Sequence, residues 1–147
     1  VQNARGCQEL VRRIATRFTA LKELTIDAQH AQAEVLDELR SLKLQRIVLL
    51  DPTLDVMRRL NELDSVTSVH LKMFADEPSE FELSKLPPAV NNIYLRGKKA
   101  RLTAKHFETL SKYKNLVELN FSNIPFDADD VAKFEAALPN CRVLYEK

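Results

Sequence analysis

The chain has 147 residues, of which 45% are hydrophobic and 29% are charged, with 22 lysine and arginine residues against 21 acidic ones. This length supports one domain with a continuous core and excludes two well-buried domains. The net charge of +1 counts against a dedicated nucleic-acid-binding protein, and no apolar stretch reaches the roughly 18 residues of a membrane span.

The first residues give no sign of export. Residues 1–6 lack the apolar core of a secretion signal. The chain starts at valine, so we expect it to be a processed or excised form, and its cellular location stays undetermined. Residues 6–18 follow with helical spacing, and Leu10, Val11, Ile14 and Phe18 form one apolar stripe. This pattern predicts a cap helix that faces the core, and it favours that role over contact with a membrane.

Apolar residues then recur at the first, fourth and sixth positions of a short window. The windows are Leu21-Leu24-Ile26, Leu44-Ile47-Leu49, Val66-Val69-Leu71, Val90-Ile93-Leu95 and Leu116-Leu119-Phe121. They begin 23, 22, 24 and 26 residues apart, and a degenerate sixth copy begins 25 residues later at Cys141, with Leu144 in the fourth position. Five copies at nearly equal spacing predict a repeat protein with one short strand per unit.

Each interval between windows holds one helix-like segment. These segments cover residues 33–42, 56–65, 79–86, 104–114 and 128–138, and Thr103 and Asp127 are candidate caps for the last two. No proline falls inside a window, where it would remove a hydrogen bond of the sheet. A strand and a helical segment every 20–29 residues predict an α/β leucine-rich-repeat solenoid, with parallel strands on the concave face and helical segments on the convex face.

The repeat spacing also predicts the domain organisation. Residues 1–147 form a single domain, with the cap helix at 1–20, five repeats over 21–140 and a terminal half repeat at 141–147. A doubly wound α/β domain is the competing architecture. Its units are usually longer and place glycines at strand ends, whereas this chain has only two glycines.

The C-terminal part resembles the last repeat of bacterial leucine-rich-repeat proteins, many of them from planctomycetes. Members of that group often end a repeat in Leu-Pro-Asn-Cys-Lys/Arg-Val, and residues 138–143 read Leu-Pro-Asn-Cys-Arg-Val. Residues 102–107 are similar to their Val-Thr-Asp-Ala-Gly-Leu turn into the helix. The resemblance extends from about Val90 to Leu144 and implies a curved scaffold for binding, without one defined ligand.

The reactive residue types are scattered. His30, His70 and His106 lie far apart in sequence, and Cys7 and Cys141 are at opposite ends of the chain. A metal site needs three or four converging ligands. Acidic residues gather at 76–82 and 127–130, where helices are expected to begin, so capping is favoured over calcium binding. We therefore expect no catalytic residues, no cofactor, no metal site and no enzymatic activity.

The strand pattern also predicts a binding face, because alternate side chains of a strand point to opposite faces. The residues beside the core positions form the concave surface, and this set includes Val143 and Tyr145 in the sixth strand. Within the set, the predicted partner-binding residues are Arg46, Val48, Leu50, His70, Lys72, Tyr94, Arg96 and Asn120. Aromatic and arginine side chains on a sheet are typical of interface hot spots.

The sequence thus predicts a protein–protein interaction module that binds another protein through the concave face. Two alternatives stay open. The chain is then either an accessory segment of a larger enzyme or regulatory protein, or a weak polyanion binder through the basic turn at residues 96–101. The identity of the partner and the oligomeric state are not predicted.

Overall fold

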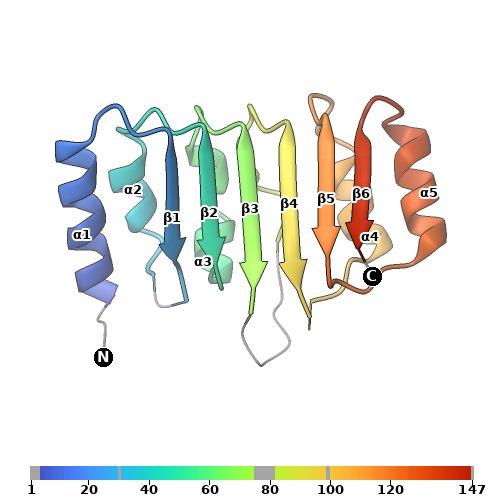
Figure 1. Ribbon diagram of the computed structural model, residues 1–147, viewed down its shortest axis with the longest axis horizontal. Coiled ribbons are helices and arrows are strands. Elements are labelled where there is room, and N and C mark those ends of the chain that lie inside the picture. Colours follow the sequence, from blue (N-terminus) through green and yellow to red (C-terminus); the bar gives the residue numbers. More distant parts are fainter. Residues whose placement is uncertain (1–3, 30, 75–81, 99, 147) are drawn as a thin grey trace.

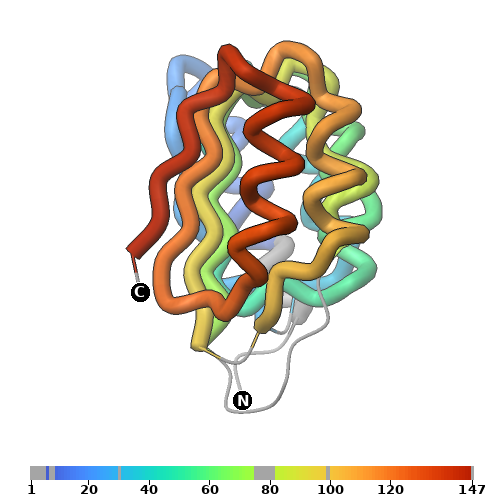
Figure 2. Tube along the Cα trace, turned by 90° about the vertical axis from the view of Figure 1, so that its right-hand side faces the viewer, coloured from blue at the N-terminus to red at the C-terminus, as the bar shows by residue number. Residues whose placement is uncertain are grey.

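The computed structural model describes residues 4–29, 31–74, 82–98 and 100–146. Six parallel strands form one open sheet in chain order: β1 (Glu23–Asp27), β2 (Arg46–Leu50), β3 (Ser68–Met73), β4 (Asn92–Gly97), β5 (Glu118–Ser122) and β6 (Arg142–Glu146). The strands lie side by side in Figure 1, and Figure 2 shows the sheet on one side and the helices on the other. The predicted fold, a leucine-rich-repeat solenoid, is confirmed.

The strand register confirms the five complete windows and corrects the sixth. Leu24 pairs with Ile47, and the ladder continues through the fourth window positions to Leu119. The next partner of Leu119 is Val143, and Leu144 pairs with the concave-face residue Asn120. The prediction for β6 was therefore one residue out of register. The ring of Tyr145 stacks on Phe121 at 5.5 Å between centroids, which favours tyrosine on the core side.

The core is a stack of window residues closed by the helical layer. The fourth and sixth window positions in β2 to β5 are at most 1% exposed: Ile47, Leu49, Val69, Leu71, Ile93, Leu95, Leu119 and Phe121. First window positions such as Leu44 and Val66 are also buried. Removing these side chains from water is the main source of stability in such a stack.

The helical elements are α1 (Ala4–Arg17), α2 (Val35–Leu39), α3 (Leu54–Met57), the 3-10 helix η1 (Leu60–Glu62), α4 (Ala104–Leu110) and α5 (Ala128–Ala137). Those that follow β1 in the chain are shorter than predicted. No helix among them is long and apolar enough to cross a bilayer, within the residues described. The predicted caps lie at the helix starts. Asp127 accepts a hydrogen bond from the Asp129 amide at 2.9 Å, and His106 Nδ1 accepts one from the Thr103 amide at 3.1 Å.

Between β3 and β4 the described residues 82–91 form turns, so the helix predicted at 79–86 is wrong there; residues 79–81 lie outside the described ranges. Two consecutive prolines, Pro87 and Pro88, disfavour a helix at this point. The phenol of Tyr113 supports the turns instead. It accepts a hydrogen bond from the Leu86 amide at 3.0 Å and donates one to the Leu83 carbonyl at 3.2 Å.

The N-terminal helix α1 packs against α2 at the β1 end of the stack (Figure 1). Its contact face is narrower than predicted. Val11 and Ala15 are 3% and 8% exposed, whereas Leu10 and Phe18 are both 58% exposed. Residues four apart lie on one side of a helix, and Leu10 is rotated from Val11 by about 100°. The predicted burial of Leu10 and Phe18 is therefore wrong.

The register can be tested with two adjacent substitutions in β5. Leu119→Ala is expected to lower the free energy of unfolding by about 2–5 kcal/mol, because it opens a cavity in the core. Asn120→Ala, on the concave face, is expected to cost less than about 1 kcal/mol. Urea denaturation of both variants measures the difference. Equal losses would contradict the register.

The role of Tyr113 can be tested separately. Tyr113→Phe removes the hydroxyl that bonds to two backbone groups of the helix-free segment, and we expect a loss of about 1–2 kcal/mol. Tyr145→Phe is the matched control on an exposed side chain, with an expected change within about 0.5 kcal/mol. Thermal and urea melts would measure the change in the free energy of unfolding of both variants. An unchanged stability of Tyr113→Phe would show that the segment does not depend on this phenol.

Candidate binding face

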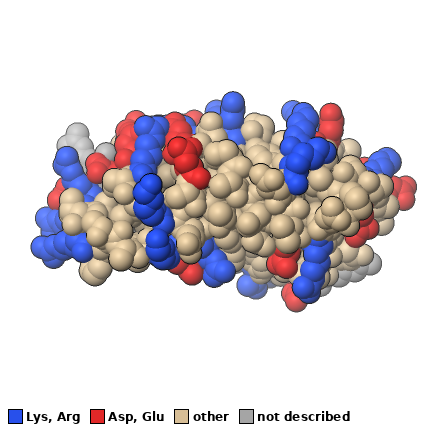
Figure 3. Space-filling model, turned by 90° about the horizontal axis from the view of Figure 1, so that it is seen from above, with Lys and Arg blue, Asp and Glu red and all other residues tan. Residues whose placement is uncertain are grey.

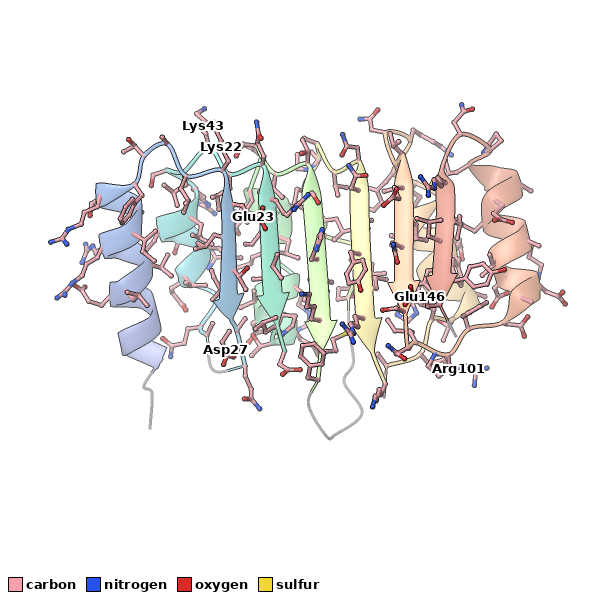
Figure 4. The ribbon with its side chains drawn as sticks, in the orientation of Figure 1. Lys22, Glu23, Asp27, Lys43, Arg101 and Glu146 are labelled. Atoms are coloured by element: carbon pink, nitrogen blue, oxygen red, sulfur yellow. The ribbon has the colours of Figure 1, made fainter. Side chains whose placement is uncertain are left out.

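Strand pairing arranges the concave side chains into three rows that cross the sheet. The amino row is Glu23, Arg46, Ser68, Asn92, Glu118 and Arg142; the central row is Thr25, Val48, His70, Tyr94, Asn120 and Leu144; the carboxyl row is Asp27, Leu50, Lys72, Arg96, Ser122 and Glu146. In Figure 4, Glu23 and Asp27 mark the two ends of β1, and Glu146 lies across the sheet on β6. All eight predicted partner-binding residues lie on this one face.

The two residues of β6 that were assigned to the concave face do not lie there. Val143 and Tyr145 alternate with Leu144 and are in register with the core residues Leu119 and Phe121. Leu144 takes the central-row position instead. The C-terminal end of the face therefore carries the apolar side chain of Leu144 and lacks the aromatic side chain of Tyr145.

A depression of about 480 Å³ lies over the amino and central rows. Three predicted residues line it, namely Arg46, His70 and Tyr94. The rest of its lining was not among the predicted site residues: Lys22, Glu23, Gln45, Thr67, Ser68, Asn92, Ile93 and Glu118. Three of these residues, Lys22, Gln45 and Thr67, each lie one residue before a strand. This shared position is the sequence pattern from which they could have been predicted.

Backbone bonds hold those preceding residues at the edge of the face. The Lys22 carbonyl accepts hydrogen bonds from the amides of Gln45 and Arg46, at 2.8 and 3.0 Å. In the same way, the Gln45 carbonyl accepts hydrogen bonds from the two amides of residues 67 and 68. Figure 3 looks onto this edge and shows basic side chains scattered among neutral and acidic ones, without a continuous basic surface.

The centre of the face is an aromatic pair that spans β3 and β4. The ring centroids of His70 and Tyr94 are 5.2 Å apart, and both side chains are partly buried. The Tyr94 hydroxyl lies 3.2 Å from Ser122 Oγ on β5. These contacts hold the Tyr94 side chain in place. Binding of a partner over it would therefore cost little conformational entropy of that side chain.

The surroundings of His70 disfavour its protonated form. Burial lowers the pKa of its imidazole, and the positive charges of Arg46 and Lys72 lower it further, against a small opposing effect of Glu23. A neutral imidazole offers one hydrogen-bond donor and one acceptor. The surroundings of His70 therefore favour a polar, uncharged side chain at the centre of the face.

Two cations of the carboxyl row, Lys72 and Arg96, are register partners on neighbouring strands. Within the described ranges neither makes an ion pair, whereas Arg46 in the amino row lies 3.3 Å from a carboxylate oxygen of Glu23. The Arg96 guanidinium carbon is 5.9 Å from the centroid of the Phe74 ring, which is itself 55% exposed. As far as the chain is described, Lys72 and Arg96 can therefore bind an acidic group without first losing an ion pair.

Val48 is at its predicted position but is only 5% exposed, and it lies outside the main apolar core cluster. It is a short side chain between longer neighbours, with Arg46 and Leu50 on its own strand and His70 on β3. Val48 therefore offers little surface to a partner, and its contact with one stays a prediction. Leu50 and Asn120 are partly exposed, as a contact residue requires.

The basic turn begins at the end of β4. Gly97 is required there, because a Cβ atom on it would lie 2.9 Å from the carbonyl oxygen of Met73. Lys98 and Arg101 are exposed, and Lys99 lies outside the described residues. Figure 4 shows Arg101 pointing away from the sheet. The turn thus presents its cations beyond the carboxyl row and outside the depression.

No group of three or more His, Cys, Asp or Glu residues is placed to hold a metal, as far as the chain is described. Burial raises the pKa of the Cys141 thiol, which disfavours the reactive thiolate. Of the acidic groups, Asp127 caps α5, and Glu82 accepts a hydrogen bond from the Ser84 amide at 2.9 Å. His30, Asp76, Glu77, Glu80 and the side chain of Cys7 lie outside the described part. The absence of catalysis stays a prediction.

No protein-family model and no curated protein matches this chain. Among solved structures, it is similar to a leucine-rich-repeat protein of Leptospira interrogans, at 17% sequence identity and a TM-score of 0.46. The match covers 85% of this chain and 37% of that protein. The chain therefore spans well under half of that protein's length. Its fold follows from its own strand order and register, which define a leucine-rich-repeat solenoid.

The electrostatics of the face can be tested by titration. By NMR we expect His70 to titrate below the ordinary value of about 6.5. Because the folded state disfavours protonation, the contribution of His70 to stability is full above about pH 6.5 and decreases as the pH falls toward its folded pKa. Lys72→Gln is expected to move the His70 pKa upward, and Arg101→Gln is the control. A His70 pKa at or above 6.5 would contradict this account.

Proposed function

We propose that this chain is a protein-interaction module that binds another protein through its concave face, with contacts centred on Tyr94. The observation that supports this most directly is the arrangement around that residue. A partly exposed tyrosine, held by His70 and Ser122, borders a depression of about 480 Å³. It lies beside Lys72 and Arg96, which make no ion pair with any residue that the structure describes. Arg46, Leu50, His70, Lys72, Arg96 and Asn120 complete the proposed contact surface.

The physical argument rests on preorganisation. Tyrosine and arginine contribute most per residue at interfaces, because they combine large contact area with hydrogen bonding. A sheet that continues on both sides of β3 and β4 keeps these side chains in fixed relative positions. Binding to such a surface costs less conformational entropy than binding to a loop.

The charges of the face favour a partner with two chemically different parts. Lys72 and Arg96 suit a carboxylate, and arginine can bind it through two parallel hydrogen bonds. The depression carries balanced charge, from Lys22 and Arg46 against Glu23 and Glu118, together with neutral amides and hydroxyls. A neutral, hydrogen-bonding segment followed by an acidic residue therefore fits the face.

The same surface also serves if the chain is an accessory segment of a larger enzyme or regulatory protein, of the bacterial, planctomycete-type group that its C-terminal repeats resemble. Polyanion binding through the turn at 96–101 is the second candidate, supported by the exposure of Lys98 and Arg101. It predicts binding that weakens steeply with salt and that depends on those two residues.

The proposal is tested by quantitative capture of binding proteins with wild-type protein and variants, followed by calorimetry with the captured protein. Tyr94→Ala and Lys72→Glu/Arg96→Glu are each expected to weaken binding by more than about 1 kcal/mol, with the fold retained by circular dichroism. Lys105→Glu/Lys112→Glu, on the helical side, is the matched control. Unchanged affinity in both concave variants would exclude this face and make Lys98 and Arg101 the next residues to test.

A further inference from the structure

The carboxyl row contains a pair of cations on neighbouring strands, called here the cation pair. It consists of Lys72 on β3 and Arg96 on β4, which are register partners, so their backbones lie one strand spacing apart, about 4.8 Å. In the same row, Leu50 on β2 and Ser122 on β5 lie on either side of the pair. Two positive charges therefore lie side by side, with uncharged side chains on both neighbouring strands.

The nearest carboxylates do not form ion pairs with these cations. Asp27 on β1 and Glu146 on β6 belong to the same row but are each two strands away from the nearer cation. Asp51 directly follows β2, and its Oδ1 accepts a hydrogen bond from the Phe74 amide. Within the part of the chain that the structure describes, no ion pair neutralises either member of the cation pair.

The Phe74 ring holds the Arg96 side chain in position and leaves its hydrogen-bond donors available. The guanidinium carbon lies 5.9 Å from the ring centroid, which is within the range of a cation–π contact. Such a contact uses the positive charge and no N–H group. Arg96 makes no side-chain hydrogen bond to a described residue, so its planar set of donors can bind an anion.

A carboxylate satisfies only part of the cation pair. Arginine can bind both oxygens of a carboxylate, which then brings a single negative charge to two cations. A phosphate monoester carries a charge of about −1.5 to −2 at pH 7 and three acceptor oxygens. It can therefore offer two oxygens to Arg96 and the third to Lys72. The number of uncompensated charges favours a phosphate monoester over a carboxylate.

The side chains beside the two cations are apolar. Phe74 is 55% exposed, and Leu50 is partly exposed. Leu50 is the register partner of Lys72, and Phe74 is in contact with Arg96. An aromatic ring that carries the phosphate can bury apolar surface against both residues while the phosphate reaches the cations. Tyrosine is therefore the carrier of phosphate that fits this part of the face.

We propose that the cation pair binds a phosphorylated tyrosine side chain of the partner protein, with the ring of that tyrosine against Leu50 and Phe74. This inference rests on the proposed function, because it specifies the acidic residue that follows the neutral segment in the depression. His70 and Tyr94 occupy the adjacent central row, so the segment and the phosphotyrosine bind next to each other. Binding of the partner then depends on its phosphorylation.

The first probe is N-acetyl-phosphotyrosine amide, titrated into isotope-labelled protein and followed by NMR. We expect saturable shifts, at millimolar concentrations, of the signals of four residues: Leu50, Lys72, Phe74 and Arg96. We also expect the pKa of His70 to rise on binding, because the added negative charge offsets the positive charge of Lys72 that lowers it.

Three related compounds test the charge of the ligand and its carrier. N-acetyl-sulfotyrosine amide has a similar shape but one negative charge, inorganic phosphate lacks the ring, and N-acetyl-tyrosine amide lacks the anion. Each is expected to bind at least about threefold more weakly than the phosphotyrosine amide. Equal binding of the sulfate ester would reject the argument from charge. Equal binding of inorganic phosphate would identify a site for the free anion and would reject a phosphorylated side chain as its ligand.

Variants of the protein test the two cations separately. Arg96→Lys keeps the charge but loses the paired donors, and it is expected to weaken binding of the phosphotyrosine amide at least about threefold. Lys72→Gln/Arg96→Gln is expected to abolish the saturable shifts with the fold retained by circular dichroism. Lys98→Gln/Arg101→Gln removes two cations of the nearby turn and is the matched control, with unchanged affinity expected.

The inference is overturned if the titration gives no saturable shifts at Lys72 and Arg96, or if affinity follows Lys98 and Arg101 instead. The proposed function is tested separately, by capture of the partner protein before and after phosphatase treatment. Capture that requires Tyr94 but persists after phosphatase treatment rejects the phosphotyrosine and leaves the proposed function standing. Capture that Tyr94→Ala does not weaken rejects the proposed function itself, whereas binding of the phosphotyrosine amide is measured without any partner.

Discussion

The parallel ladder is the constraint on which the rest of this structure depends. Each strand bonds to the strand of the preceding repeat at an offset of 22 to 26 residues, and this offset brings equivalent positions together. A repeat alone cannot bury its apolar residues, because they face the neighbouring unit. The ladder therefore decides at once which side chains enter the core and which form rows on the concave face.

The convex side tolerates more variation than the ladder. The intervals between strands contain helices of four to ten residues, a 3-10 turn, or turns alone. What they share is closure of the core by buried residues such as Leu36, Leu60 and Leu110. Where a helix is absent, a side chain from the next repeat, Tyr113, bonds to the backbone that would otherwise lack partners. Repeats of different length are thus compatible with one continuous parallel sheet.

The two ends of the stack are closed differently. At the N-terminal end α1 places Val11 and Ala15 against the core and leaves Leu10 and Phe18 in solvent. At the C-terminal end an aromatic group of Phe121, Phe126 and Tyr145 covers the last strand only in part.

The sequence by itself determined the period, the strand positions and the concave rows from β1 to β5. These follow from local alternation and equal spacing, which place a strong apolar residue at every fourth and sixth position. It did not determine the register of β6, where both Val143 and Leu144 are apolar and only the stacking of Tyr145 on Phe121 distinguishes them. Tertiary contacts likewise decided which residues of α1 are buried and that Val48 is buried. They also decided that turns stand where a helix was predicted at residues 79–86. Each depends on which neighbours surround a residue in space, and a repeat pattern carries no information about those neighbours.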